Sequence, residues 1–344
     1  MGKRILLTGG TGYVGGSVLT ALTTAHPEYE ITVLLRKVPS DFEARYPTVN
    51  IAHGELDQVD KIRDLSAKND IVILCGKSGK HIPALEAHIE GLLQRDTPTF
   101  LIRLAGTSII ADFWEGNAHG ELNEKVWSDV DHVDEITSLP DNYQHRPVDK
   151  ILHRAAEEHP DRLNVAIICP PGIYGQGRGA GNTQSLFLPE YYEEIIKLGR
   201  SFYAGSGKNT RGWVHIDDLV KVYVALVESA VAGGGNATWG REGYYFAESQ
   251  EASQKEMAKH AGKILKARGL VAQAEPVQLS IDTVREMRGG SSWEPMGIYT
   301  WASNTRTRGD RARKLLGYKP NAPSLWETME EDFLVAKTVL EQKA

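Results

Sequence analysis

The chain has 344 residues, of which 41% are hydrophobic and 24% are charged, a balance typical of a globular protein. The length suits a nucleotide-binding domain with a smaller second lobe. The formal net charge of −6 leaves no basic excess for nucleic-acid phosphates. No window approaches the roughly 20 apolar residues of a membrane span. We therefore expect a cytoplasmic protein, with Cys75 and Cys169 reduced and buried in apolar runs.

The first half of the chain alternates short apolar runs with longer amphipathic segments. This rhythm predicts strands bounded by Gly, Pro or charge, at residues 4–10, 30–36, 50–56, 70–76, 99–106 and 163–170. Helical patterns lie between them, at residues 14–26, 59–69, 81–95 and 147–159. The pattern predicts an α/β fold with a doubly wound parallel Rossmann sheet, because right-handed crossovers place helices on both of its faces.

The rhythm changes after Pro170, where a glycine-rich loop precedes helical patterns near 189–199, 252–268 and 324–342. We expect this part to build a smaller C-terminal substrate lobe. The predicted division gives the NADP-binding Rossmann domain residues 1–170 plus 215–246. The predicted substrate lobe takes residues 171–214 plus 247–344.

The stretch "TGGTGYVGG" places Gly9, Gly12 and Gly15 in a G-x-x-G-x-x-G spacing, directly between a predicted strand and a predicted helix. Glycines at these positions allow a tight turn and a close approach of the backbone to a pyrophosphate. The helix N-terminus then offers free amide donors and a positive dipole end. The motif predicts a dinucleotide-binding site.

The second strand ends in "VLLRKVPS", so that Arg36 and Lys37 stand where an NAD-preferring site normally carries an acid. Two cations without a carboxylate suit the 2′-phosphate of NADP. We therefore favour NADP(H) over NAD(H) as the cofactor.

These residues, together with four later segments, resemble the extended branch of the short-chain dehydrogenase/reductase superfamily, the NAD-dependent epimerase/dehydratase-like proteins. The segments are "HGELDQVDKI", "CPPGIYGQGRG", "RGWVHIDDLVKVYVALVE" and "RARKLLGYKP". The resemblance runs nearly end to end. It implies an active site at the carboxyl ends of the strands, roofed by the C-terminal lobe.

The resemblance also implies a catalytic Ser or Thr after the fifth strand and a Tyr-x-x-x-Lys on the next helix. In the family, the lysine binds the nicotinamide ribose and the tyrosine passes a proton to or from the substrate oxygen. Lys150 falls on the lysine, and Thr107, followed by Ser108, falls on the hydroxyl. Arg146 falls on the tyrosine.

An arginine cannot serve as the acid, because its pKa lies far above working pH. Tyr143, in the loop before the helix, is one alternative proton donor, and His145 is another. Arg146 itself suits an anion such as a substrate carboxylate or enolate. Three functions stay open: an NADP(H)-dependent oxidoreductase, an epimerase, isomerase or dehydratase with retained cofactor, and a regulatory protein that binds NADP(H) without turnover.

The remaining expectations concern binding residues and partners. By resemblance, we expect a small-molecule substrate to contact Tyr174, Arg211 and Trp213, whereas His215, Asp217 and Asp218 are expected to fix a turn and cap a helix. Trp293 and Trp301 are a candidate apolar wall, with a packed lobe core as the alternative. A homodimer through 81–95 and 147–159 is a further expectation. No metal-ligand spacing occurs, so no metal site is predicted. The residues expected to bind the cofactor are Gly9, Thr11, Gly12, Tyr13, Val14, Gly15, Arg36, Lys37, Leu56, Cys75, Gly76, Lys150, Pro170 and Ile173.

Overall fold

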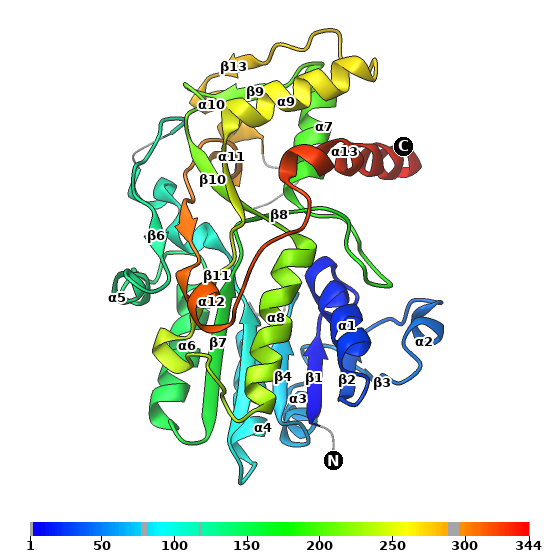
Figure 1. Cartoon of the computed structure of the whole chain (residues 1–344), viewed down its shortest axis with the longest axis vertical. Helices are drawn as coiled ribbons and strands as arrows, with labels where there is room; N and C mark the ends of the chain where they lie inside the picture. Colours follow the sequence, from blue (N-terminus) through cyan, green and yellow to red (C-terminus); the bar gives the residue numbers. More distant parts are fainter. Residues whose placement is uncertain (1–2, 77–80, 117–118, 288–295, 344) are drawn as a thin grey trace.

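The computed structural model describes residues 3–76, 81–116, 119–287 and 296–343, and its largest sheet has seven parallel strands with helices on both sides (Figure 1). The strand order is β11-β7-β5-β4-β1-β2-β3, and every neighbouring pair is parallel. The order reverses at β1, as in a doubly wound fold. The strands are β1 (Arg4–Thr8), β2 (Glu30–Leu35), β3 (Asn50–His53), β4 (Ile71–Leu74), β5 (Thr99–Leu104), β7 (Leu163–Cys169) and β11 (Tyr244–Phe246). The predicted fold class is confirmed.

Helices cover both faces of this sheet because successive strand residues point to opposite sides. In β1, Ile5 and Leu7 enter the core under α1 and α8, whereas Leu6 enters the core under α4 and α6. The short α2 adds to the first of these cores, and α3 packs against α4. These helices are α1 (Tyr13–Ala25), α2 (Phe42–Arg45), α3 (Val59–Ala67), α4 (Ile82–Leu93), α6 (Arg146–Glu158) and α8 (Ile216–Val231).

The C-terminal lobe lies beyond the carboxyl ends of the strands (Figure 1). One small sheet joins β8 (Gly172–Tyr174), β10 (Thr210–His215) and β12 (Gln250–Ser253). Another pairs β9 (Phe202–Ala204) with β13 (Val277–Leu279). The helices packed with them around a third core are α7 (Phe187–Leu198), α9 (Gln254–Ala267), α10 (Ile281–Glu286), α11 (Met296–Trp301) and α13 (Leu325–Lys343).

A few short elements complete the described chain. The pair β6 (Trp127–Ser128) and β14 (Thr307–Arg308) lies beside α5 (Val133–Thr137) and α12 (Asp310–Leu315). Three short 3-10 turns are η2 (Thr107–Ile110), η3 (Asp112–Glu115) and η4 (Gly240–Glu242). Helix α12 packs on β11, although we assigned it to the substrate lobe, and the domain division stays a prediction.

The helices expected to form a dimer interface, α4 and α6, lie on the same face of the sheet. On α6, exposed positions carry Lys150, Arg154 and Glu157. This polar face is not the apolar surface of an obligate interface. Pairing of two copies there stays a prediction.

Candidate active site

The phosphate-binding turn between β1 and α1 leaves room only for glycine at two of its predicted positions. Gly9 has a φ of 79°, and a Cβ built there would lie 2.0 Å from the Cys75 carbonyl oxygen. A Cβ on Gly15 would lie 2.3 Å from the Gly9 carbonyl oxygen. Gly12 is the N-cap of α1 and makes no side-chain cap, so the first backbone amides remain available to a ligand. The turn therefore fits a pyrophosphate.

A cavity of about 660 Å³ opens above this turn. Of the residues predicted to bind the cofactor, its lining contains Gly9, Thr11, Gly12, Tyr13, Val14, Gly15, Arg36, Lys37, Leu56, Cys75 and Gly76. Its other lining residues are Thr8, Leu34, Leu35, Gly54, Glu55, Asp57, His81 and Leu104. Lys150, Pro170 and Ile173 are not part of this lining. The glycine cradle and the lining fit a dinucleotide that runs along the carboxyl ends of β1, β2 and β4.

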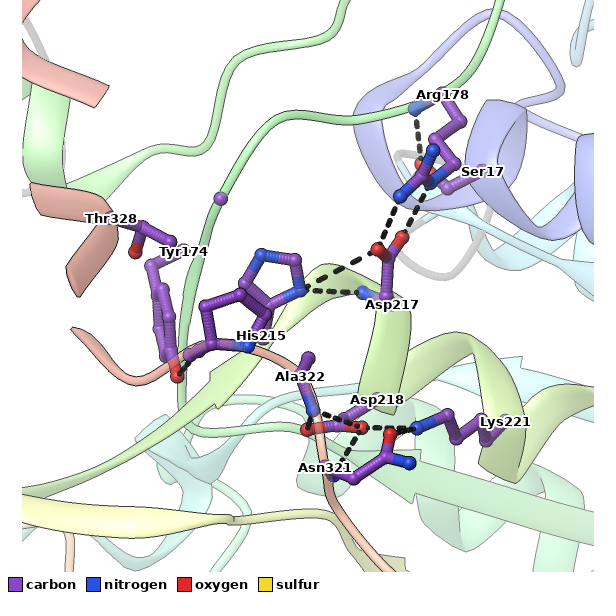
Figure 2. A network of polar contacts seen from close by, with 12 residues as sticks. Ser17, Tyr174, Arg178, His215, Asp217, Asp218, Lys221, Asn321, Ala322 and Thr328 are labelled. Carbon is purple, nitrogen blue, oxygen red and sulfur yellow. Dashed lines mark hydrogen bonds and ion pairs between the residues drawn. The ribbon is translucent and has the colours of Figure 1, made fainter. Parts of the chain in front are cut away.

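The loop after β8 is tied to the phosphate-binding turn. The Tyr13 hydroxyl donates to the carbonyl oxygens of Tyr174 and Gly175, at 3.0 and 2.7 Å. Burial raises the pKa of Tyr13. The amide of Arg178 donates to Ser17 Oγ at 3.0 Å, as Figure 2 shows. The loop is thus held against the start of α1.

The start of α8 confirms the structural roles expected for its polar residues (Figure 2). His215 Nδ1 accepts the Asp217 amide proton at 3.1 Å and caps the helix. Asp217 also pairs with the Arg178 guanidinium of the neighbouring loop. Asp218 accepts from the amides of the 321–322 turn and from Lys221, so it holds the connection to α13. These contacts are structural.

The hydroxyl position after β5 lies beside His145. Ser108 is buried in η2, and its Oγ lies 3.1 Å from His145 Nε2. A Cβ on Gly106 would lie 3.4 Å from the same nitrogen, so the imidazole fits closely against the end of β5. Among the described non-glycine residues, His145 alone has a positive φ, 73°. This backbone conformation is uncommon for a residue other than glycine. The neighbouring Thr107 is also buried, and its Oγ1 has no hydrogen-bond partner among the described residues.

Sequence reasoning missed a buried charged group behind His145. Arg103 lies in β5, is fully buried, and forms an ion pair with Asp149 of α6. Its Nη2 lies 3.3 Å from His145 Nδ1. The Tyr244 hydroxyl of β11 donates to the other Asp149 oxygen at 2.6 Å. Burial raises the pKa of Asp149, and Arg103 opposes that shift. The signal was an arginine within the apolar run "TFLIRLAG", where an unpaired charge would be too costly to bury.

The two residues aligned with the family's Tyr-x-x-x-Lys, Arg146 and Lys150, have other contacts than Ser108 and His145. Lys150 lies on the outer side of α6, 51% exposed, and its Nζ contacts both Asp141 oxygens at 2.8 Å. Arg146 is buried and donates to the carbonyl oxygens of Thr137 and Leu139, so it fixes the preceding turn. The structure therefore gives no support to ribose binding by Lys150 or to anion binding by Arg146.

The other predicted proton donor, Tyr143, stacks on Trp114 with ring centroids 5.2 Å apart. Burial raises the pKa of Tyr143, with a smaller contribution from Glu115. Trp114 Nε1 donates to the Ser108 carbonyl oxygen at 2.9 Å. Trp114 therefore lies between Tyr143 and the Ser108 backbone. Pro170 is also near, because its carbonyl accepts the Thr107 amide proton at 3.1 Å.

The predicted substrate contacts are mostly engaged within the lobe. Arg211 lies between the rings of Phe187 and Tyr299, at 4.5 and 4.7 Å, and Nη2 donates to the Tyr299 carbonyl. Its Nη1 is buried without a hydrogen-bond partner among the described residues. Trp213 packs edge-on against Phe187. The Tyr174 hydroxyl donates to the Pro323 carbonyl oxygen, 2.9 Å away.

Of the two tryptophans predicted to form an apolar wall, only Trp301 lies within the described residues. Trp301 belongs to the lobe core, where it contacts Tyr191 and Phe202, which confirms the packed-core alternative for this residue. Trp293 lies outside the described residues.

Within the described residues, no group of three or more His, Cys, Asp or Glu side chains is arranged to hold a metal ion. Within them also, no helix combines the length and apolar character that crossing a membrane requires. Cys75 and Cys169 are buried and form no disulfide, as expected.

Comparison with known proteins identifies the family. Residues 5–104 and 141–239 match the NAD dependent epimerase/dehydratase family. The chain is 32% identical over 342 residues to the oxidase ucsJ of an Acremonium species, which covers 96% of each chain. A UDP-glucose 4-epimerase from Thermotoga maritima, solved with UDP-glucose, has a TM-score of 0.65 at 14% identity over 98% of this chain and 99% of its own. A dTDP-glucose 4,6-dehydratase double mutant from Streptomyces venezuelae, solved with NAD, also has a TM-score of 0.65, at 15% identity over 97% of each chain.

The chain belongs to the NAD dependent epimerase/dehydratase family. It is an enzyme of the extended short-chain dehydrogenase/reductase type, as the sequence motifs indicated. Because the solved neighbours are under 25% identical, they establish its fold and no more.

Proposed function

We propose that this enzyme is an NADP(H)-dependent oxidoreductase acting on a carbonyl or hydroxyl group of a small organic substrate. In this proposal, Ser108 and His145 together replace the tyrosine that the family motif lacks here. The single observation behind it is the 3.1 Å contact between Ser108 Oγ and His145 Nε2 at the carboxyl end of β5. A titratable group within hydrogen-bond reach of a buried hydroxyl is the geometry that proton transfer requires.

The proposed cofactor site is the 660 Å³ cavity. Arg36 and Lys37 border it at the end of β2, where the ribose 2′-position of a bound dinucleotide would lie, and both side chains are exposed to it. Glu55 and Asp57 border the same cavity from the β3 side, and Asp57 is paired with His81. The two cations support NADP(H), as the sequence indicated.

The proposed reaction needs one hydride and one proton for each carbonyl group reduced. A bound NADPH would supply the hydride that adds to the carbonyl carbon. The Ser108 hydroxyl donates its proton to the resulting alkoxide oxygen, and Ser108 Oγ takes the proton from His145 Nε2. Solvent returns a proton to the ring, so the enzyme ends as it began. Oxidation of an alcohol follows the same steps in reverse. A neutral imidazole that polarises a substrate carbonyl is known from triosephosphate isomerase.

Two measurements test the cofactor and the reaction. The dissociation constants of NADPH and NADH, titrated against the whole protein, should favour NADPH by about 10-fold or more, as charge-assisted contacts to a phosphate imply. A clear preference for NADH would overturn this assignment. A panel of carbonyl substrates, monitored by NADPH absorbance at 340 nm, should show consumption of the cofactor.

An epimerase, isomerase or dehydratase reaction with retained cofactor is the second candidate, and the family match favours it. It predicts product formation without net change of absorbance at 340 nm. A substrate that is converted while the cofactor stays constant would therefore select this alternative over net oxidation or reduction.

A further inference from the structure

The buried group behind His145 has the spacing of the family's catalytic motif but different residues. His145 and Asp149 are four positions apart at the start of α6, as are the tyrosine and lysine of Tyr-x-x-x-Lys. The cation is not on the helix. It is Arg103, which enters from β5 and reaches both His145 Nδ1 and the Asp149 carboxylate.

We propose that Arg103, held by Asp149 and Tyr244, is a positioning residue that fixes the tautomer of His145. This inference rests on the proposed role of His145 in proton transfer. A guanidinium can only donate hydrogen bonds, so the contact at 3.3 Å requires His145 Nδ1 to accept. The single ring proton of the neutral imidazole must then lie on Nε2, which is the nitrogen facing Ser108.

This arrangement leaves the Ser108 hydroxyl proton free to point at a substrate oxygen. Nε2–H donates to Ser108 Oγ, and Oγ can then donate its own proton onward. When the ring gives up the Nε2 proton, the guanidinium beside Nδ1 stabilises the negative charge that develops. The cation thus acts from the side of the ring opposite to the substrate.

The partners of Arg103 hold it in that position. Asp149 is fully buried, so its charge requires a partner, and it receives both the guanidinium and the Tyr244 hydroxyl at 2.6 Å. Arg103 lies in β5 and Tyr244 in β11, so side chains from two strands of the sheet and from α6 together fix the ring. A group built from both strands and helix is rigid enough to set a hydrogen-bond direction.

The test is the tautomer of His145 in the whole protein, observed by NMR with ¹⁵N-labelled histidine. His145→Gln assigns the signal by its loss. In the unmodified protein we expect the two ring nitrogens to show the Nε2–H pattern. The double variant Arg103→Met/Asp149→Leu removes both charges together, which avoids leaving one of them buried and unpaired. In this variant we expect the pattern to become that of a mixture of tautomers. An unchanged Nε2–H pattern in the double variant would overturn the proposal, as would an Nδ1–H ring in the unmodified protein.

A milder variant keeps the test valid if the double variant does not fold. Tyr244→Phe removes one hydrogen bond to Asp149 and keeps the ion pair. We expect a partial shift toward the mixture and a fall in kcat of about threefold to tenfold, as loss of one supporting hydrogen bond implies. KM for NADPH should stay within about twofold, because Tyr244 is not part of the cavity lining. Arg154→Ala, on the exposed side of α6, is the control and should change neither quantity. A Tyr244→Phe signal identical to the unmodified one would contradict the inference.

The outcome can be separated from that of the proposed function. Two results together would support the positioning role of Arg103 and overturn the catalytic role of His145. The first is an Nε2–H pattern that becomes a mixture of tautomers in the double variant, and the second is full activity of His145→Gln.

Discussion

The phosphate-binding turn and the N-terminus of α6 lie along the same edge of the sheet, but they are built from different parts of the chain. The turn depends on backbone: Gly9 and Gly15 are placed where any side chain would strike a carbonyl oxygen. The α6 region depends on side chains that are far apart in sequence, since Arg103 and Ser108 meet His145 from about 40 residues away. A backbone site leaves a local motif in the sequence, whereas a site of distant side chains does not.

The largest expected effect concerns the Ser108 hydroxyl, beside the N-terminus of α6. Ser108→Ala should lower kcat by about 10²- to 10⁴-fold, the usual contribution of general acid–base catalysis. The dissociation constant of NADPH should change little, because Ser108 is not part of the cavity lining. Stopped-flow kinetics at 340 nm and a separate cofactor titration measure the two quantities. Thr107→Val tests the competing hydroxyl and should cost less than about threefold; the opposite ranking would assign the role to Thr107.

The second effect concerns the pH dependence of stability, through His153 in the middle of α6. Burial, aided by the nearby cations Arg146, Arg241 and Arg103, lowers the pKa of His153 to about 4. Its unfolded value is near 6.5, so the unfolded chain binds this proton first as pH falls. The contribution of this histidine to the free energy of unfolding should therefore be fully present above pH 6.5. It should fall by up to about 3 kcal/mol as the pH falls to 4. Urea titrations at several pH values should show a flatter profile in His153→Gln. An identical profile would show that this histidine does not govern the decline.

The third effect concerns the phosphate-binding turn. Gly9→Ala adds a Cβ 2.0 Å from the Cys75 carbonyl oxygen, so the turn must move and NADPH binding should weaken by about 100-fold or more. Gly199→Ala is the matched control, since Gly199 has a similar φ of 74° but no heavy atom within 4 Å of the added carbon. It should lower stability slightly and leave binding intact. Calorimetric titration of both variants decides, and equal binding by both would contradict the clash.

The contrast explains what could be predicted. The parallel sheet, the glycine cradle and the cations after β2 follow from local patterns, because periodicity and turn chemistry are properties of neighbouring residues. The role of α6 could not be read in the same way. Aligning Lys150 with the family's lysine fixes a position in sequence, but the helix presents Lys150 to solvent and Asp149 to the interior. Neighbouring residues on a helix are rotated by about 100° from each other, which is enough to expose Lys150 and bury Asp149. The partner of Asp149 is on a strand 46 residues earlier, which no local spacing reveals.

The smallest expected effect follows from that rotation. Lys150→Ala removes an exposed side chain paired only with Asp141 among the described residues, so both kcat and the NADPH dissociation constant should stay within about threefold. The same assays used for Ser108→Ala measure it. A loss of 100-fold or more would show that Lys150 turns inward when the cofactor binds, and would restore the role that the motif assigned to it.

The central claim is that His145, acting through Ser108, carries the proton that the missing tyrosine would carry. The most direct measurement compares His145→Gln with Tyr143→Phe in single-turnover hydride transfer, each saturated with NADPH and monitored at 340 nm. We predict a loss of about 10²- to 10⁴-fold for His145→Gln, and a rate within about threefold of the unmodified enzyme for Tyr143→Phe. A full rate in His145→Gln together with a large loss in Tyr143→Phe would contradict the claim and assign the proton to the phenol stacked on Trp114.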